Sequence, residues 1–72
     1  MKITVHSVGS LKRFVEPGTV LEDVRTVGEA VERLSLPESK GLVMLVNERL
    51  ANWNTSLTDG DTLQLIPTIA GG

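Results

Sequence analysis

Residues 26–37, TVGEAVERLSLP, carry the secondary-structure signal that decides the fold of this 72-residue sequence. Thr26 can cap the backbone N–H groups at the start of a helix, and Glu29, three residues later, completes a capping box. Pro37 predicts where the helix ends. A helix of about ten residues is marginal alone, so its apolar face is expected to pack on a sheet. That face is formed by side chains at i, i+3, i+4 and i+7, which are Val27, Ala30, Val31 and Leu34.

The residues on either side of the helix have the patterns of β-strands. The first segment alternates apolar and polar side chains, which is typical of a strand with one buried face. The run LVMLV at 42–46 is continuously apolar and predicts a strand covered on both faces or nearly so. In the last segment, Leu63 and Leu65 are expected to point inward. Strands are expected at residues 2–8, 19–24, 42–46, 49–51 and 62–66, with turn signals between the later ones.

The order of these elements predicts the fold class. Two strands precede the helix and three follow it, which indicates an α+β protein. The pattern is that of the ubiquitin-like β-grasp, a mixed sheet of four to five strands packed on one main helix. We expect a single β-grasp domain at residues 1–66 and a flexible, extended C-terminal tail at residues 67–72.

The composition argues against several kinds of partner. A net charge of −2, with 22% charged residues, leaves no basic excess to neutralise a phosphate backbone, so no nucleic-acid partner is expected. No segment approaches the roughly 20 apolar residues of a membrane span, and the first residues lack the apolar run of a signal peptide. We therefore expect a cytoplasmic protein without a membrane partner.

The sequence also lacks the residue sets that enzymes of known types use. It has no cysteine and a single histidine, His6, so no metal site is expected and His6 is interpreted as a surface residue. Neither a glycine-rich phosphate motif nor a nucleophile with a matching base is present. We therefore expect that the protein is not an enzyme by itself.

Three further features each allow a structural and a functional interpretation. The segment Asp59-Gly60-Asp61 is typical of a turn before a strand, although its carboxylates could bind a metal. The ring of Trp53 can cover the edge of the core or stack on a ligand. Lys12, Arg13 and Arg49 form either solvated surface or a contact with a partner.

The final stretch, LIPTIAGG at 65–72, leads from an apolar strand through a proline to two glycines. Pro67 cannot donate a hydrogen bond to a sheet, so it is expected to release the chain from the last strand. Six extended residues reach about 20 Å. A Gly-Gly end can enter a narrow channel, where the carboxylate of Gly72 would react. A fraying terminus and an expression scar are the alternatives.

Several of these motifs together match a known family. The run VNERLANWNTSLTDGD at 46–61, followed by an apolar strand, Pro67 and Gly71-Gly72, closely resembles the MoaD/ThiS family of ubiquitin-like sulfur carrier proteins. The small subunit of molybdopterin synthase is the member it is most similar to. The first half is similar too, with LKR at 11–13, PG at 17–18 and TVGE at 26–29. The resemblance implies that the first and last strands pair in parallel.

The resemblance also implies a function and a set of partners. A ubiquitin-activating-type enzyme would use ATP and Mg²⁺ to adenylate Gly72, and a sulfur donor system would convert the adenylate to a thiocarboxylate. The chain itself would bind no cofactor. The sulfur would pass to the large molybdopterin synthase subunit in molybdenum cofactor biosynthesis or, alternatively, to a thiazole synthase in thiamine biosynthesis. A ubiquitin-like protein modifier or interaction module is the other alternative.

The same resemblance assigns roles to individual residues. Gly72 would carry the adenylate and then the thiocarboxylate. On the sheet, His6 stands where the family commonly has an aromatic residue. The residues expected to thread into a partner are Pro67, Thr68, Ile69, Ala70 and Gly71. The residues expected to dock on a partner are His6, Leu50 and Ile66, with Arg49 added from the small basic patch.

Overall fold

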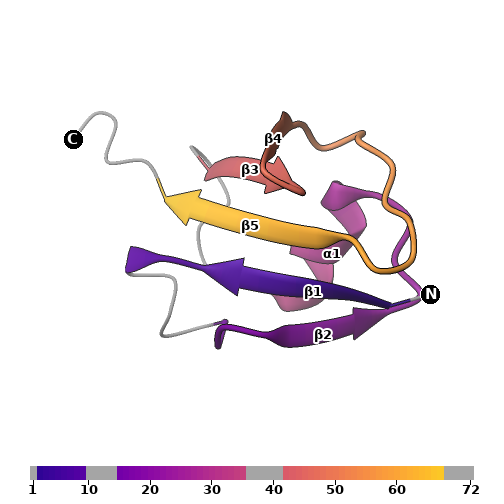
Figure 1. The fold of residues 1–72 in the computed structure, drawn as a ribbon, viewed down its shortest axis with the longest axis horizontal. Helices are drawn as coiled ribbons and strands as arrows, with labels where there is room; N and C mark the ends of the chain where they lie inside the picture. The colour runs from indigo at the N-terminus through magenta and orange to yellow at the C-terminus, as the bar shows by residue number, and fades with distance from the viewer. Residues whose placement is uncertain (1, 10–14, 36–41, 68–72) are drawn as a thin grey trace.

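A five-stranded mixed sheet with one helix forms the protein in the computed structural model, which describes residues 2–9, 15–35 and 42–67. The sheet order is β2-β1-β5-β3-β4, with β1 and β5 parallel and every other neighbouring pair antiparallel. Figure 1 shows α1 behind the sheet, so only one sheet face is covered by the helix. The expected α+β, β-grasp architecture is confirmed. The elements are β1 (Lys2–Ser7), β2 (Thr19–Glu22), α1 (Val27–Leu34), β3 (Leu42–Val46), β4 (Arg49–Ala51) and β5 (Thr62–Pro67).

The helix begins where the capping signal predicts. The hydroxyl oxygen of Thr26 accepts a hydrogen bond from the backbone N–H of Glu29 at 3.2 Å. The helix ends at Leu34, before Pro37 is reached, because Ser35 adopts a left-handed conformation with φ of 53° and caps the last turn. The helix is therefore slightly shorter than expected.

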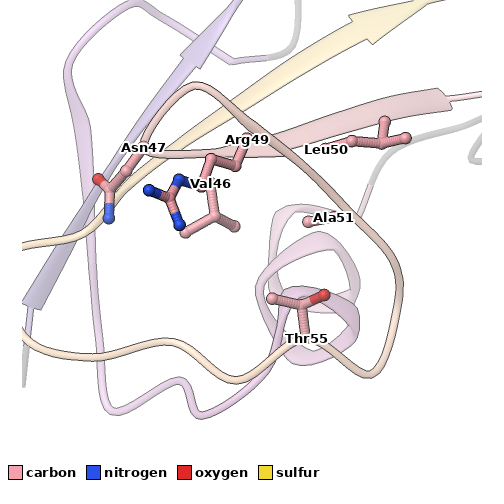
Figure 2. Close-up of a pocket in the computed structure, with 6 residues that line it drawn as sticks. All are labelled: Val46, Asn47, Arg49, Leu50, Ala51 and Thr55. Atoms are coloured by element: carbon pink, nitrogen blue, oxygen red, sulfur yellow. The ribbon is translucent and has the colours of Figure 1, made fainter.

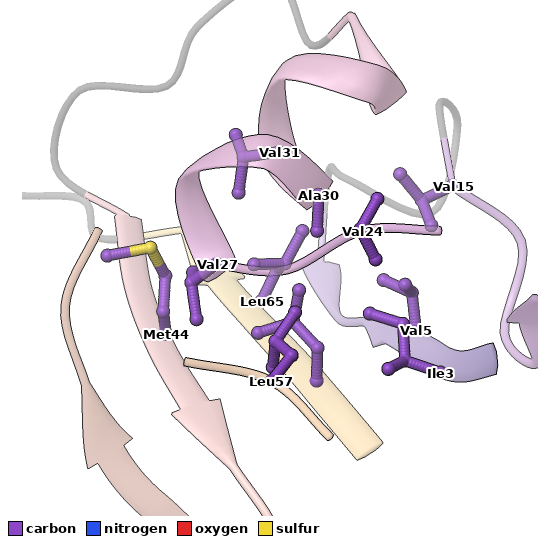
Figure 3. Close-up of a cluster of buried hydrophobic side chains, with 11 residues drawn as sticks. Ile3, Val5, Val15, Val24, Val27, Ala30, Val31, Met44, Leu57 and Leu65 are labelled. Carbon is purple, nitrogen blue, oxygen red and sulfur yellow. The ribbon is translucent and has the colours of Figure 1, made fainter. Parts of the chain in front are cut away.

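The hydrophobic core fills the space between α1 and the covered face of the sheet (Figure 3). Leu63 and Leu65 point inward from β5 as predicted, and neither exposes any side-chain surface. Three of the four predicted helix residues are buried, and Leu34 packs at the margin of the core. The buried apolar residues are Ile3, Val5, Val15, Val24, Val27, Ala30, Val31, Met44, Leu57, Leu63 and Leu65.

The prediction that β3 is covered on both faces is wrong. Only Met44 of this strand is buried, and the other four residues are partly exposed. The reason is that α1 covers a single face of the sheet, so the alternate side chains Val43 and Leu45 face away from the core. The run is continuously apolar although only one set of its side chains faces the core, because the alternate set on the uncovered face is apolar too.

Three strand ends also differ from the predictions. The first strand ends at Ser7, one residue before its predicted end at residue 8. The second strand stops at Glu22 because Asp23 has a positive φ of 59°, which turns the chain out of the sheet. Val24 is nevertheless fully buried beyond the strand. The last strand extends one residue further than expected, to Pro67, which lies opposite Leu42 in β3.

The loop after β4 holds the N-terminus of α1. The Trp53 carbonyl accepts the Gly28 N–H at 2.9 Å, and the Thr55 carbonyl accepts the Val27 N–H at 3.0 Å. A Cβ on Gly28 would lie 3.0 Å from that Trp53 oxygen, so the carbonyl would have to shift to admit a side chain. The contact that ties Trp53 to the helix is thus made by its backbone, while 43% of the residue is exposed. These N–H groups at the helix start are satisfied within the chain.

Candidate functional site

The side of the sheet opposite α1, here called the open face, displays the alternate residues of each strand. Residues that are directly opposite in the register share a face. On the open face His6 lies opposite Gln64, Val43 opposite Ile66, and Leu45 opposite Leu50. The structure therefore places His6, Leu50 and Ile66, three of the four expected docking residues, on one surface.

Apolar side chains gather at the β3, β4 and β5 side of the open face. Leu50 is 80% exposed, the largest value among the exposed large hydrophobic side chains described. Its cross-strand neighbour Leu45 and the pair formed by Val43 and Ile66 are partly exposed beside it. We call these four residues, Val43, Leu45, Leu50 and Ile66, the docking patch. An apolar surface of this kind on a small domain is typical of a protein–protein contact.

Sequence reasoning missed two members of the docking patch. Val43 and Leu45 were assigned to a strand buried on both faces, and the open face gives them a different environment. The signal that could have found them is their period-two relation to Met44, which points to the core. That signal is useful only once one face of the sheet is known to be open.

Arg49, the fourth expected docking residue, lies on the other face of β4. It is opposite Val46 in the register, and Val46 packs against the core. A cleft of about 550 Å³ lies here (Figure 2). Arg49 is therefore separated from the docking patch by the thickness of one strand. The cleft is lined by Val46, Asn47, Arg49, Leu50, Ala51 and Thr55.

Pro67 marks the place where the last strand leaves its parallel partner. The Val8 N–H donates to the Leu65 carbonyl at 3.3 Å, so Leu65 is a residue of β5 that bonds to β1. Every second residue of β5 faces β1 in this way, which makes Pro67 the next one. Pro67 has no N–H to donate there, and its ring packs 3.5 Å from the ideal Cβ position of Gly9.

The start of the tail is thus released on one side only. Pro67 stays in register with Leu42 of β3 while its pairing with β1 ends. The expectation that Pro67 frees the chain needs this correction, since Pro67 is itself the last residue of β5. Ile66 belongs to the docking patch, so the chain that follows leaves from the border of that surface. The expected threading residues Thr68, Ile69, Ala70 and Gly71, and Gly72, lie outside the described residues.

The segment Asp59-Gly60-Asp61 forms the turn that the sequence predicts. The Asp61 carboxylate accepts hydrogen bonds from the Thr58 N–H and from Asn47 Nδ2, each at 2.8 Å. The hydrogen bond from the Thr58 backbone is the main cause that lowers the pKa of Asp61, and the Asn47 amide adds to it. The Asp59 carboxylate accepts the Lys2 N–H at 2.7 Å. Both carboxylates therefore hold the turn in place.

Groups that could hold a metal are not assembled in the part of the chain that the structure describes. Across residues 2–9, 15–35 and 42–67, no cluster of three or more His, Asp or Glu side chains has the geometry of a metal site. Within the same ranges no helix is long and apolar enough to cross a membrane. Among the described residues, the candidate sites are therefore the docking patch and the cleft beside Arg49; the predicted tail after Pro67 lies outside these residues.

A mixed sheet of this order wrapped on one helix defines a ubiquitin-like β-grasp protein. The profile of the ThiS family matches residues 7–72. The chain therefore belongs to the ThiS family. The match runs from β1 to the last residue of the sequence and so includes both glycines of the Gly-Gly end.

Solved structures agree with this assignment. One is the complex of subunits 1 and 2 of the molybdopterin-converting factor from Helicobacter pylori, in which the similar chain is 29% identical at a TM-score of 0.72, with 100% of both chains covered. SAMP1 from Haloferax volcanii is 19% identical at a TM-score of 0.78, also over 100% of both chains. The putative molybdopterin converting factor subunit 1 from Pyrococcus furiosus is 18% identical at 0.76, covering 94% of this chain and 98% of that one. A search of curated proteins found no match.

Proposed function

We propose that this chain is a sulfur carrier that donates sulfur from a thiocarboxylate at Gly72 in molybdopterin biosynthesis. The observation that carries the proposal is the family match, which extends through the Gly-Gly end of a domain with an apolar docking patch. In this proposal the domain at residues 1–66 binds the partner, and residues 67–72 carry the thiocarboxylate to the partner's active site.

The proposed chemistry begins with a carboxylate that must become an electrophile. A ubiquitin-activating-type enzyme transfers AMP from ATP, with Mg²⁺ balancing the phosphate charge, and releases pyrophosphate. The acyl adenylate at Gly72 then has a good leaving group. The donor system delivers sulfur at the oxidation level of hydrosulfide, which attacks the acyl carbon of the adenylate. The bond to AMP breaks, the sulfur loses its proton, and the thiocarboxylate that remains is the nucleophile that the acceptor uses. The chain supplies positioning and an unhindered end, and the activating enzyme supplies the catalysis.

The docking patch and the tail are adjacent, and the proposal uses this arrangement. Ile66 and Pro67 are consecutive, so a partner that covers the patch holds the base of the tail at its own surface. Delivery of Gly72 then becomes an intramolecular step with a high effective concentration. Because Pro67 is still paired with β3, the tail starts from a fixed point rather than from a flexible hinge. This geometry favours entry into one channel.

The acceptor is proposed from the comparison that has the higher identity. The structure that is 29% identical was solved with the second subunit of a molybdopterin-converting factor. A synthase of that type is therefore the proposed partner, with a thiazole synthase as the alternative that the family allows. Both reactions depend on ATP-driven activation, which favours a cytoplasmic site of action.

The test is the intact mass of the protein isolated from its own host without reducing agent. We expect a population heavier by the replacement of one oxygen by sulfur, and fragmentation should locate the change at Gly72. The same spectrum shows whether Gly72 is the last residue of the mature chain. A wholly unmodified population in cells that are making the cofactor would contradict the proposal, and isopeptide conjugates to lysine would favour a protein modifier.

Deletion of Gly72 separates the chemistry from the fold. We expect the shortened chain to keep its far-ultraviolet circular dichroism spectrum and its stability, because all the core residues that the structure describes precede the tail. ATP–pyrophosphate exchange by the activating enzyme should be lost. Exchange that continues at the normal rate would mean that another group is adenylated.

A further inference from the structure

The free edge of β4 has a hydrogen-bond donor that the sheet does not use. The Asn47 N–H donates to the Thr62 carbonyl at 2.9 Å, which makes residue 47 a position of this segment that bonds to β5. Bonding alternates along a strand, so Leu45 also faces β5, and its opposite residue Leu50 makes no ladder bond to β3. The N–H of Leu50 therefore points away from the sheet.

The loop after β4 satisfies the next backbone N–H along this edge. The Asn52 N–H donates to the Thr55 hydroxyl at 2.9 Å, and the Asn52 side chain accepts the Asn54 N–H at 2.8 Å. The next outward position on the strand is thus already satisfied. A whole added strand would find only one residue to pair with, so the edge fits a single polar group better than an extended peptide.

The residue before that donor carries a positive charge. Arg49 precedes Leu50, and both line the same cleft although consecutive strand residues point to opposite faces. The cleft therefore reaches around the edge of β4 (Figure 2). Among the residues that the structure describes, those that line it include no acidic side chain, and Val46 and Ala51 contribute an apolar wall. Arg49 and Leu50 border one cleft that has an apolar wall, so a carboxylate on a short aliphatic stem that enters the cleft can reach the flexible guanidinium and the outward N–H.

We propose that the β4 edge is a binding site for one acidic side chain of the sulfur-accepting partner. The carboxylate accepts hydrogen bonds from the Arg49 guanidinium and from the Leu50 N–H. A partner that covers the docking patch reaches this site around the edge, because the Leu50 side chain belongs to the patch and its N–H belongs to the site. The inference rests on the proposed function, since it needs a partner on the open face.

The charge distribution supports an acidic group at this site. The chain has a net charge of −2, and the repulsion weakly disfavours a partner that is acidic overall. A single carboxylate aimed at Arg49 gains a charge-assisted hydrogen bond without that repulsion. The site thus fixes the orientation of the partner on the docking patch, because an apolar contact by itself is weakly directional.

The experiment measures binding of the full-length chain to the purified subunit-2-type synthase protein from the same genome, by calorimetry at several salt concentrations. Arg49→Ala should weaken binding about tenfold or more and should flatten its salt dependence. Arg49→Lys should recover part of the loss, because lysine keeps the charge without the planar fork. Arg25→Ala removes an exposed arginine outside the cleft and is the matched control, expected to bind like the wild type.

A second measurement reads the backbone donor directly. On binding, the ¹⁵N–¹H resonance of Leu50 should move downfield as its N–H donates to a carboxylate, and Arg49→Ala should reduce that shift. If Arg49→Ala binds as tightly as the wild type and the Leu50 resonance does not shift, this inference is wrong. The proposed function would still stand. Failure of the wild-type chain to bind the synthase protein would overturn both for this acceptor.

Discussion

The two faces of the sheet use the same strands for different purposes. On β5, Leu65 is fully buried against α1, whereas its neighbour Gln64 lies on the open face among partly exposed residues. On β3 and β4 the open face carries apolar residues that the fold does not need for its core. Burial on one face supplies stability, and the uncovered apolar surface on the other supplies a place for a partner. Apolar character alone therefore does not show which task a strand residue performs.

The largest effect should separate the two faces within one strand. Leu65→Ala removes a side chain from the middle of the core, and we expect it to cost about 2–5 kcal/mol of unfolding free energy, because the cavity adds to the lost transfer energy. This is a large part of the stability of a small domain. Gln64→Ala, one residue away on the open face, should change stability by less than about 0.5 kcal/mol. Urea denaturation followed by circular dichroism measures both, and equal losses would contradict the division of the faces.

The second effect tests how tightly the helix of the covered face is held. Alanine normally stabilises a helix position by about 1 kcal/mol over glycine, yet Gly28→Ala should destabilise this protein by about that amount. The new Cβ would meet the Trp53 carbonyl at 3.0 Å, and that carbonyl is held by its hydrogen bond to the Gly28 N–H. Glu32→Ala, at an exposed position of the same helix, is the control and should be close to neutral. If Gly28→Ala is instead more stable than the wild type, the loop that contains Trp53 can move to accommodate the new Cβ.

Much of this architecture could be predicted from the sequence, because local chemistry determines it. The N-cap at Thr26, the apolar helix stripe and the turn signals around Asn47 and Asp61 each act within a few residues. The openness of the second sheet face could not be predicted in this way. A continuous apolar strand such as residues 42–46 has the same composition whether a helix or a partner protein covers it.

The candidate site shows the same limit. Leu50 and Arg49 are consecutive and were predicted as docking residues together, but strand geometry sends them to opposite sides of β4. Only the register with β3, in which Leu50 lies opposite Leu45, shows which one shares a face with Ile66. The role of Pro67 likewise depends on which neighbour it faces, and that is a tertiary property.

A third, smaller effect concerns the turn that joins the β3–β4 hairpin to β5 and belongs to neither face. Hydrogen bonds lower the pKa of Asp61, so its contribution to stability is present above the ordinary carboxyl pKa and is lost as the pH falls through the lowered value. Asp61→Asn should therefore be less stable than the wild type at neutral pH, by less than about 1 kcal/mol. The difference should shrink toward acid pH. Denaturation curves between neutral and strongly acidic pH measure it, and Asp59→Asn is the matched comparison in the same turn.

The smallest effect on stability should come from the most exposed apolar side chain. Leu50→Ala removes a residue that is 80% exposed, so the unfolding free energy should change by less than about 0.5 kcal/mol, in contrast to Leu65→Ala. Binding to the synthase protein should nevertheless weaken about tenfold or more, because a central apolar contact of the docking patch is lost. Val20→Ala offers a control on the same open face, since Val20 is exposed but lies on β2, at the far edge of the sheet. If both variants bind equally well, the partner does not use the β3, β4 and β5 side of the open face, and the apolar residues there need another explanation.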